Sequence, residues 1–389
     1  MIEGEPENVI QGRKILFVTT MSWTIKAFLL PYARAIWKEG GVVDAMCNGS
    51  VDELEKNFRK TWSVKFTRSP ALAIFLMPYT LLHVRKIIIE ENYDVVHVHT
   101  PISSFLARLS VALIKKEKRP KVIYTAHGFH FHPLGSMIAN LIFLRLEKFA
   151  ARYTDYLITI NEWDYDVARK RHFLPEDRIY HIKGIGVDSK TYDLEEISEE
   201  DIEDLKNEIG CRDDTKIFCV IGEFNPGKRH IDVLNAVKDM ENVKVLLVGD
   251  GKLRKNMQER AEAMDLMDKV VFLGYRNDVP CILKASDAML FPSIREGLPR
   301  AVMEAMAMGT PVIASDIRGV RELLSDGCGM LVEPKNPKAI ANAMRWLIEN
   351  EEEAKKMAAK ARDRIFKEFD ISVVLPQHLE VYTRALVER

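Results

Sequence analysis

The chain has 389 residues, of which 47% are hydrophobic and 29% charged, and its 56 basic side chains almost balance 57 acidic ones. This composition is typical of a soluble globular protein and excludes a disordered chain, a collagen-like repeat and a small disulfide-stapled scaffold. At roughly 100–200 residues per domain, the length predicts two domains. The five cysteines are scattered without CxxC spacing, so we expect neither a disulfide framework nor a zinc site. This cysteine usage is typical of a protein of the reducing cytoplasm.

Two segments bear on targeting. The first twelve residues carry three glutamates and no apolar run, which predicts a disordered tail and no signal peptide. No stretch reaches the roughly 18 apolar residues of a membrane span. The longest candidate, residues 71–82, is too short and contains Pro78, so we expect a core helix there.

Short β-branched runs alternate with longer helical patterns along the whole chain. In the first half, strands are predicted at 14–19, 42–47, 94–99, 122–126 and 156–160, and helices at 27–39, 105–116 and 136–152. The second half repeats the pattern, with strands at 216–222, 243–249, 270–274, 288–291 and 311–315. This alternation predicts an α/β protein with two Rossmann-like, doubly wound parallel sheets.

A turn-rich segment at residues 182–188 marks the predicted domain boundary. It gives way to an acidic stretch, and its two glycines would allow a hinge. We therefore place one domain at residues 13–188 and the other at 189–370. Ligands of open parallel sheets bind beyond the carboxyl ends of the strands, so we expect a cleft between the domains.

The near-zero total charge hides an asymmetry between the halves. Residues 13–190 hold 27 basic and 17 acidic side chains, a net of +10, whereas residues 191–389 hold 29 and 37, a net of −8. Such a split indicates that the halves meet different partners. We expect the basic half to face anionic lipid.

The strongest motif follows the strand predicted at 288–291. Pro299 suits a first helical position and Gly309 a C-terminal cap, so we expect a helix from about Pro299 to Met308. The N–H groups of Gly297 and Leu298 at its amino end would suit a phosphate or a sugar hydroxyl.

Glu296 and Glu304 flank this helix start, eight positions apart. Carboxylates that accept hydrogen bonds from vicinal hydroxyls are a common means of holding ribose or a hexose. For an arbitrary pair, a solvated helix residue and a partner for the helix dipole would be the ordinary interpretation. The surrounding sequence favours a binding role instead.

The run Arg295-Glu-Gly-Leu-Pro-Arg-Ala-Val-Met-Glu-Ala-Met-Ala-Met-Gly-Thr-Pro-Val-Ile-Ala314 resembles the E-x7-E motif of the retaining family 4 glycosyltransferases, which have the GT-B fold of two facing Rossmann-like domains. Comparable segments occur in order at residues 94–101, 124–131 and 248–251. The first two are similar to the subgroup that builds capsule, exopolysaccharide and lipid-linked glycans. In this fold the amphipathic segment at residues 371–389 would cross back onto the first domain.

The resemblance implies a role for each matching residue of the second domain. Glu296 would bind hydroxyls of the transferred sugar, supported by the N–H groups of Gly297 and Leu298, and Glu304 would bind the ribose. Tyr275 and Arg276 follow a strand where the family contacts the base, although Tyr275 is equally explained by surface packing.

The loop after the strand at 216–222 would bind the diphosphate. Family members commonly carry an Arg directly after this strand and a Lys a few residues later. Lys228 matches the second, but Glu223 stands where the Arg is expected. The resemblance therefore leaves charge neutralisation to Lys228, with Arg229 as a candidate substitute.

In the first domain, His127 follows a predicted strand and precedes Gly128, which permits close backbone approach. The family places a His here beside the transferred sugar. His99 ends the neighbouring strand and is a further substrate-binding candidate. The nearby histidines could also indicate a metal site. No Cys or paired carboxylate accompanies them, so we expect that no metal is bound there. The Asp164-Tyr-Asp166 sequence mimics a metal-binding D-x-D motif, but it follows the good N-cap Asn161 and is better explained as the first turn of a helix.

The first strand leads into a loop that holds Thr20 and Lys26, which would face the acceptor or the sugar. No glycine lies in this loop, whereas a dinucleotide-binding fold would place G-x-G-x-x-G there. The absence argues against an NAD-dependent dehydrogenase or epimerase.

The resemblance implies a retaining hexosyltransferase that takes a hexose or N-acetylhexosamine from a nucleotide sugar, with UDP-sugar favoured, to a polyprenyl-diphosphate-linked saccharide. It implies a same-face mechanism with no metal or other cofactor, no nucleic-acid partner, and a cytoplasmic enzyme peripheral on the inner face of the membrane. A soluble acceptor and a catalytically silent nucleotide-sugar sensor remain alternatives. The individual sugar and the linkage are not readable from the residues.

Overall fold

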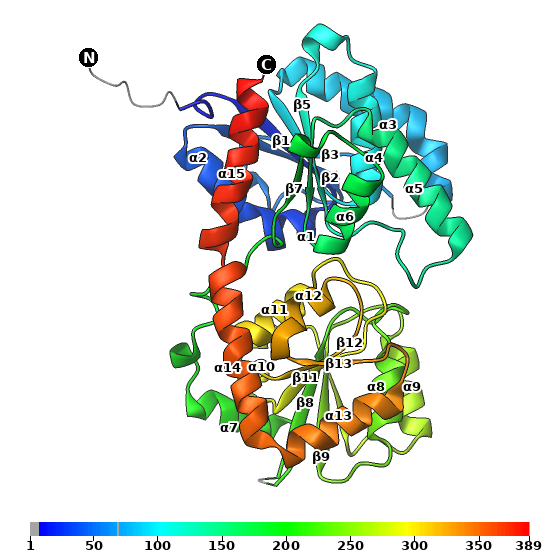
Figure 1. Ribbon diagram of the computed structural model, residues 1–389, viewed down its shortest axis with the longest axis vertical. Helices are drawn as coiled ribbons and strands as arrows, with labels where there is room; N and C mark the ends of the chain where they lie inside the picture. Colours follow the sequence, from blue (N-terminus) through cyan, green and yellow to red (C-terminus); the bar gives the residue numbers. More distant parts are fainter. Residues whose placement is uncertain (1–7, 68–69, 213, 389) are drawn as a thin grey trace, which may run out of the picture. The chain divides into compact units, whose positions relative to one another are not determined.

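The computed structural model describes residues 8–67, 70–212 and 214–388. The chain forms two compact units, one of residues 1–185 with 374–389 and the other of residues 186–373 (Figure 1). Each unit contains one parallel sheet covered by helices. Within the described residues the first sheet has seven strands in the order β3-β2-β1-β4-β5-β6-β7, and the second has six in the order β10-β9-β8-β11-β12-β13.

The first unit contains strands β1 (Lys14–Met21), β2 (Val42–Asn48), β3 (Thr61–Ser63), β4 (Val95–Val98), β5 (Lys121–Ala126), β6 (Tyr156–Thr159) and β7 (Ile179–His181). Its main helices are α1 (Ser22–Thr24), α2 (Leu30–Lys38), α3 (Pro70–Glu91), α4 (Pro101–Ala112), α5 (Met137–Ala151) and α6 (Glu162–Lys170), joined by most of α15 (Ile371–Val387). A π-helical turn, Ile25–Leu29, links α1 to α2.

The second unit contains strands β8 (Lys216–Ile221), β9 (Val243–Val248), β10 (Val270–Gly274), β11 (Ala288–Phe291), β12 (Val312–Ser315) and β13 (Met330–Val332). Its main helices are α7 (Glu199–Glu208), α8 (His230–Val237), α9 (Arg254–Ala263), α10 (Val279–Ala285), α11 (Arg300–Ala307), α12 (Val320–Leu324), α13 (Pro337–Glu349) and α14 (Glu351–Glu368).

Both sheets reverse their strand order at one point, between β1 and β4 in the first and between β8 and β11 in the second. Loops leave the two central strands in opposite directions at such a point, so a crevice opens beyond their carboxyl ends. The central strands are buried on both faces, and every residue of β4 and β11 is buried. This double burial explains their apolar sequences, which are interrupted in β4 by His97, whose two ring nitrogens are hydrogen-bonded.

The two-unit α/β fold confirms the fold class predicted from the sequence, and all ten predicted strands are present. The strands that the pattern missed are β3, β7 and β13, which are three residues long and lie at sheet edges. Such short segments contain too few residues to show a period.

Two local expectations need correction. Residues 8–12, assigned to a disordered tail, form turns in which Ile10 is buried and the Gly12 N–H donates to the Gly40 carbonyl; residues 1–7 lie outside the described residues. The segment at 71–82 is helical, as part of α3, but it is a core helix on one face only: Met77 and Leu81 pack on the core, whereas Phe75 is 80% exposed and Tyr79 is 62% exposed. Across the described residues, no helix combines the length and apolar content that crossing a bilayer requires.

The loops at the second crevice depend on a glycine contact. Gly249 has φ +134°, and a Cβ there would lie 2.2 Å from the Gly222 carbonyl oxygen. Gly249→Ala should therefore lower the melting temperature of the second unit by about 5–10 °C, measured by calorimetry. Gly210→Ala is the control, since its φ is +60° but no atom lies within 4 Å of the added Cβ. It should cost about 2–4 °C, and equal losses would contradict the contact.

Candidate active site

An ion pair spans the reversal point of the second sheet. Lys228, in the loop after β8, places its Nζ 2.8 Å from Oε1 of Glu296, in the loop after β11. The Ser293 hydroxyl donates to the same oxygen at 2.6 Å, and the lysine nitrogen lies 4.5 Å from the centre of the Phe291 ring. The structure thus brings together two of the predicted site residues in one partly buried group. An anion that reached Lys228 would compete with Glu296 for its charge.

The amino end of α11 lies beside this pair. Pro299 is the N-cap and has an extended backbone. The helix therefore begins at Arg300, one residue later than the sequence predicted. Within the described part of the chain, no hydrogen bond uses the N–H groups of Gly297 and Leu298. These two groups lie in the loop just before the helix and are suited to an anion or a sugar hydroxyl.

The sequence analysis missed two residues that hold this helix start. A Cβ at Gly319, which follows β12, would lie 1.8 Å from the Gly297 carbonyl oxygen, so only glycine permits the approach. The neighbouring Arg318 donates from Nε to the Glu296 carbonyl oxygen at 3.2 Å. The glycine after a buried strand was the one signal available in the sequence.

Glu304 lies inside α11 and is held by residues that sequence reasoning also missed. The Arg300 Nε donates to Glu304 Oε1 at 2.7 Å, one helical turn away. Burial, and secondarily the Glu304 carboxylate, raise the pKa of the Tyr192 hydroxyl, which is buried beside it. The helix ends at Gly309 in a left-handed conformation, where the N–H groups of Gly309 and Thr310 bond the carbonyls of the last turn.

The other charged side chains of the loop after β8 are engaged locally. The Arg229 guanidinium forms two hydrogen bonds, of 2.8 and 2.6 Å, with the buried carboxylate of Asp232 in the first turn of α8. Glu223 is exposed and accepts a hydrogen bond from Asn225. Lys228 is therefore the cation of this loop that faces Glu296, while Arg229 is turned toward its own helix.

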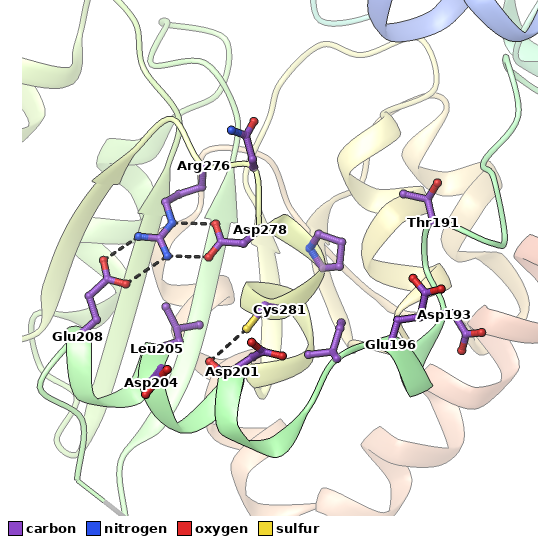
Figure 2. A pocket seen from close by; sticks show the side chains of 13 residues that line it. Thr191, Asp193, Glu196, Asp201, Asp204, Leu205, Glu208, Arg276, Asp278 and Cys281 are labelled. Atoms are coloured by element: carbon purple, nitrogen blue, oxygen red, sulfur yellow. Dashed lines mark hydrogen bonds and ion pairs between the residues drawn. The ribbon is translucent and has the colours of Figure 1, made fainter.

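Tyr275 and Arg276 follow β10 and differ in environment. The Tyr275 ring is 80% exposed. Figure 2 shows the Arg276 guanidinium between Glu208 of α7 and Asp278, with its four hydrogen bonds between 2.6 and 3.1 Å. Both carboxylates raise the pKa of Arg276, the Asp278 contact more strongly. Six of the thirteen residues that line the pocket around it are acidic. Through its bonds to Glu208 and Asp278, Arg276 joins α7 to the loop after β10.

In the first unit, His99 and His127 form a contiguous pair at the ends of β4 and β5. His99 Nδ1 lies 3.1 Å from His127 Nε2, and the rings stack with centroids 5.3 Å apart. His99 is buried, whereas His127 is partly accessible. The hydrogen bond uses one nitrogen of His127, so the buried His99 fixes the orientation of the His127 ring.

Further buried groups extend this pair. His97 bonds Thr125 on one side and, on the other, the hydroxyl of Tyr382 from α15. Burial lowers the pKa of His97 and His99 well below the usual value, and it lowers that of His127 to about 4. At neutral pH these imidazoles are uncharged, and His127 can offer a substrate hydrogen bonds rather than a positive charge.

A buried carboxylate shapes the loop after His127. Asp164 accepts a hydrogen bond from the Phe129 N–H at 3.1 Å and another from the Asn161 amide at 2.8 Å. Its own N–H donates to the Asn161 side chain, which caps α6, as the sequence indicated for this D-x-D mimic. Asp164 thus holds the Gly128 turn in place, a role the sequence did not predict.

Thr20 and Lys26, the other candidates of the first unit, are each engaged by neighbouring side chains. The Thr20 hydroxyl is buried among those of Thr100 and Ser103. Lys26 lies in the π-helical turn, half exposed, and forms an ion pair with Glu53. In the parts of the chain that the structure describes, no three His, Cys, Asp or Glu side chains lie where they could share a metal ion.

Comparison with known proteins matches both halves to family models. Residues 28–188 match the model "Glycosyltransferase Family 4", and residues 201–364 match "Glycosyl transferases group 1". The chain is 33% identical over 360 residues to glycosyltransferase EpsD of Bacillus subtilis, covering 90% of this chain and 91% of that protein. It is 30% identical over 319 residues to UDP-Gal:α-D-GlcNAc-diphosphoundecaprenol α-1,3-galactosyltransferase of Escherichia coli, covering 80% of each.

Among solved structures, the chain is similar to Anabaena Alr3699/HepE in complex with UDP. The TM-score is 0.77 at 22% identity, with 95% of this chain and all of that chain covered. This likeness supports the fold independently of the sequence matches.

The neutral state of His127 is testable by NMR on the chain labelled at its histidines. Burial favours the uncharged ring, so we expect His127 to titrate with a midpoint near 4. Because its folded pKa is lowered, its contribution to stability is present above the ordinary pKa of about 6.5 and is lost as the pH falls through about 4. Free imidazole in the same tube is the reference, and a His127 midpoint that coincides with it would contradict the prediction.

Proposed function

The chain belongs to glycosyltransferase family 4, with the GT-B fold, and from this premise we propose that it moves a hexose or N-acetylhexosamine from a UDP-sugar to a polyprenyl-diphosphate-linked saccharide. The observation that carries the proposal is the Lys228–Glu296 pair beside the free N–H groups at the start of α11. This arrangement offers a cation and two N–H donors to a diphosphate, and a carboxylate to sugar hydroxyls.

The proposed donor and acceptor draw on named relatives. The Escherichia coli relative is named for UDP-Gal and a GlcNAc-diphosphoundecaprenol acceptor, and the Anabaena structure contains UDP. In the proposed complex Glu304 binds the ribose hydroxyls, with Arg300 orienting its carboxylate, and Tyr275 stacks on the base. Arg276, engaged by two carboxylates, would support that loop from the side away from the nucleotide.

We propose a same-face reaction that retains the α configuration. The acceptor hydroxyl oxygen forms a bond to the anomeric carbon while the bond from that carbon to the UDP oxygen breaks. The proton of the acceptor passes to the departing phosphate oxygen. Lys228 and the N–H groups of Gly297 and Leu298 stabilise the charge that develops on the diphosphate. Neutral His127, from the first unit, would hydrogen-bond the sugar without adding a charge beside the positive anomeric centre.

A screen tests this activity directly. Purified chain is incubated with UDP-Gal, UDP-GlcNAc, UDP-Glc or UDP-GalNAc and a polyprenyl-diphosphate-linked saccharide, and the products are read by mass spectrometry and anomeric NMR. We expect one donor to extend the acceptor by one α-linked sugar, with unchanged rate in excess EDTA. A β-linked product, or transfer to water-soluble acceptors alone, would contradict the proposal.

Two variants separate sugar contact from nucleotide contact. Glu296→Gln should lower kcat by about 10²–10³-fold, because its carboxylate contacts the reacting sugar. Glu304→Gln should mainly raise the KM of the UDP-sugar, by about tenfold, because the ribose is bound equally in the ground and transition states. Glu259→Gln, on an exposed position of α9, is the control. Wild-type turnover in both variants would refute this site.

A further inference from the structure

An apolar surface lies on two helices of the first unit, and the proposed reaction does not use it. We call it the α3–α5 surface and define it by its exposed large apolar side chains: Leu72, Phe75, Tyr79 and Leu82 of α3, and Met137, Ile138, Leu141, Ile142, Leu146 and Phe149 of α5. Phe75 and Met137 are 80% and 84% exposed. Isolated exposed apolar side chains are ordinary in soluble proteins, but a cluster of this size marks an interaction site.

The helical spacing shows that this exposure is systematic. In α3, positions 72, 75, 79 and 82 repeat every three or four residues and line one face, while Val84, Ile87 and Ile88 are buried on another. In α5, Phe143 and Leu144 pack on the core while Ile138 and Ile142 face outward. Both helices therefore carry apolar side chains on the face away from the sheet as well as on the face toward it.

The two helices belong to one layer. Helix α4 packs against both α3 and α5, and the three helices lie together on one side of the sheet in Figure 1. Leu113, at the end of α4, is also exposed and continues the surface. The Arg85 side chain of α3 donates to its carbonyl oxygen.

The exposed charges around the α3–α5 surface are mainly basic. Arg145, Lys148 and Arg152 lie on and directly after α5. The segment after Leu113 adds four more exposed basic side chains and one acidic one: Lys115, Lys116, Lys118 and Arg119, with Glu117.

The acids of the two helices are held by cations. Glu147 of α5 pairs with buried Arg108, Glu91 of α3 pairs with Arg59 and Lys60, and Glu90 pairs with Lys86 of its own helix. The border of the surface therefore retains an excess of positive charge.

The apolar and the basic side chains lie toward opposite ends of this helix layer. Crossover helices of a parallel sheet begin at the carboxyl edge of the sheet and end at the opposite edge. The apolar starts of α3 and α5 thus lie toward the edge that carries His127, and the basic residues after α4 and α5 lie toward the other. Leu134 and Met137 follow His127 by only seven and ten positions.

We propose that the α3–α5 surface docks the first unit on an anionic lipid bilayer. The apolar side chains enter the interface between headgroups and acyl chains, and the flanking lysines and arginines contact anionic headgroups. This inference rests on the proposed function in one respect: a polyprenyl acceptor anchored in that bilayer would present its diphosphate at the sheet edge that carries His127. The charge complementarity favours lipid over a second copy of the chain, which would bring like charges together.

Cosedimentation of the full chain with vesicles tests the proposal. Vesicles of phosphatidylcholine with 30% phosphatidylglycerol, an amount on the order of that in anionic membranes, are compared with pure phosphatidylcholine at low and high salt. Binding should be stronger to the anionic vesicles and weaken with salt. The triple variant Phe75→Gln, Ile138→Gln, Ile142→Gln should reduce the partition coefficient at least tenfold. Its melting temperature should be unchanged, since these side chains are exposed.

A charge variant tests the basic border separately. The pair Arg145→Gln, Lys148→Gln should reduce binding to anionic vesicles by about fivefold per charge and flatten the salt dependence. Matched controls in the second unit are Met267→Gln, 48% exposed, and Lys255→Gln, also exposed. Wild-type vesicle binding by the triple variant would overturn the proposal. So would a wild-type dimer in sedimentation equilibrium that the triple variant dissociates.

The same variants distinguish this inference from the proposed function. With a short-chain, water-soluble diphosphate acceptor, the triple variant should transfer sugar at the wild-type rate, whereas transfer to a long-chain acceptor in vesicles should fall. Transfer by a wild-type chain that does not bind vesicles would refute the docking surface alone. Vesicle binding without transfer to either acceptor would refute the proposed function alone.

Discussion

The arrangement of the candidate site depends on one constraint, the reversal of strand order between β8 and β11. These strands are neighbours in the sheet although more than sixty residues separate them in sequence, and parallel pairing brings their carboxyl ends to the same edge. Lys228 and Glu296 meet because each follows one of these strands. The same reversal between β1 and β4 places the buried Thr20 hydroxyl beside that of Thr100 in the first unit.

Glycines allow the loops at this edge to approach closely enough for those side chains to interact. Gly249 lies against the Gly222 carbonyl and Gly319 against the Gly297 carbonyl, distances that no Cβ could tolerate. The first contact supports the loop that carries Lys228, and the second supports the start of α11. The N–H groups of Gly297 and Leu298 thus lie in a closely packed loop, and in the proposed reaction donors held in place in this way stabilise charge without reorganisation.

The candidate site residues of the two units differ in their charge state. In the second unit the site is charged, and Glu296 neutralises Lys228 until an anion competes for it. In the first unit His99 and His127 are neutral because burial disfavours the imidazolium form and lowers the pKa of both side chains. The net charge of −1 reveals neither of these environments. It also conceals the excess of basic residues in the first half, some of which border the exposed apolar face of α3 and α5.

The sequence by itself determined the class of fold, the long buried strands and the residues after them, because double burial and strand–helix alternation are local patterns. It also singled out Glu296, Glu304, Lys228 and His127 as candidate site residues through motifs of fixed spacing. It could not determine which partner each side chain takes. Only the tertiary structure turned Arg229 toward Asp232 and Arg276 toward Glu208 and Asp278, and placed Arg318 and Gly319 behind the helix start. It likewise exposed residues of α3 that composition assigned to a core, because an apolar run shows that a helix forms but not which of its faces the rest of the chain covers.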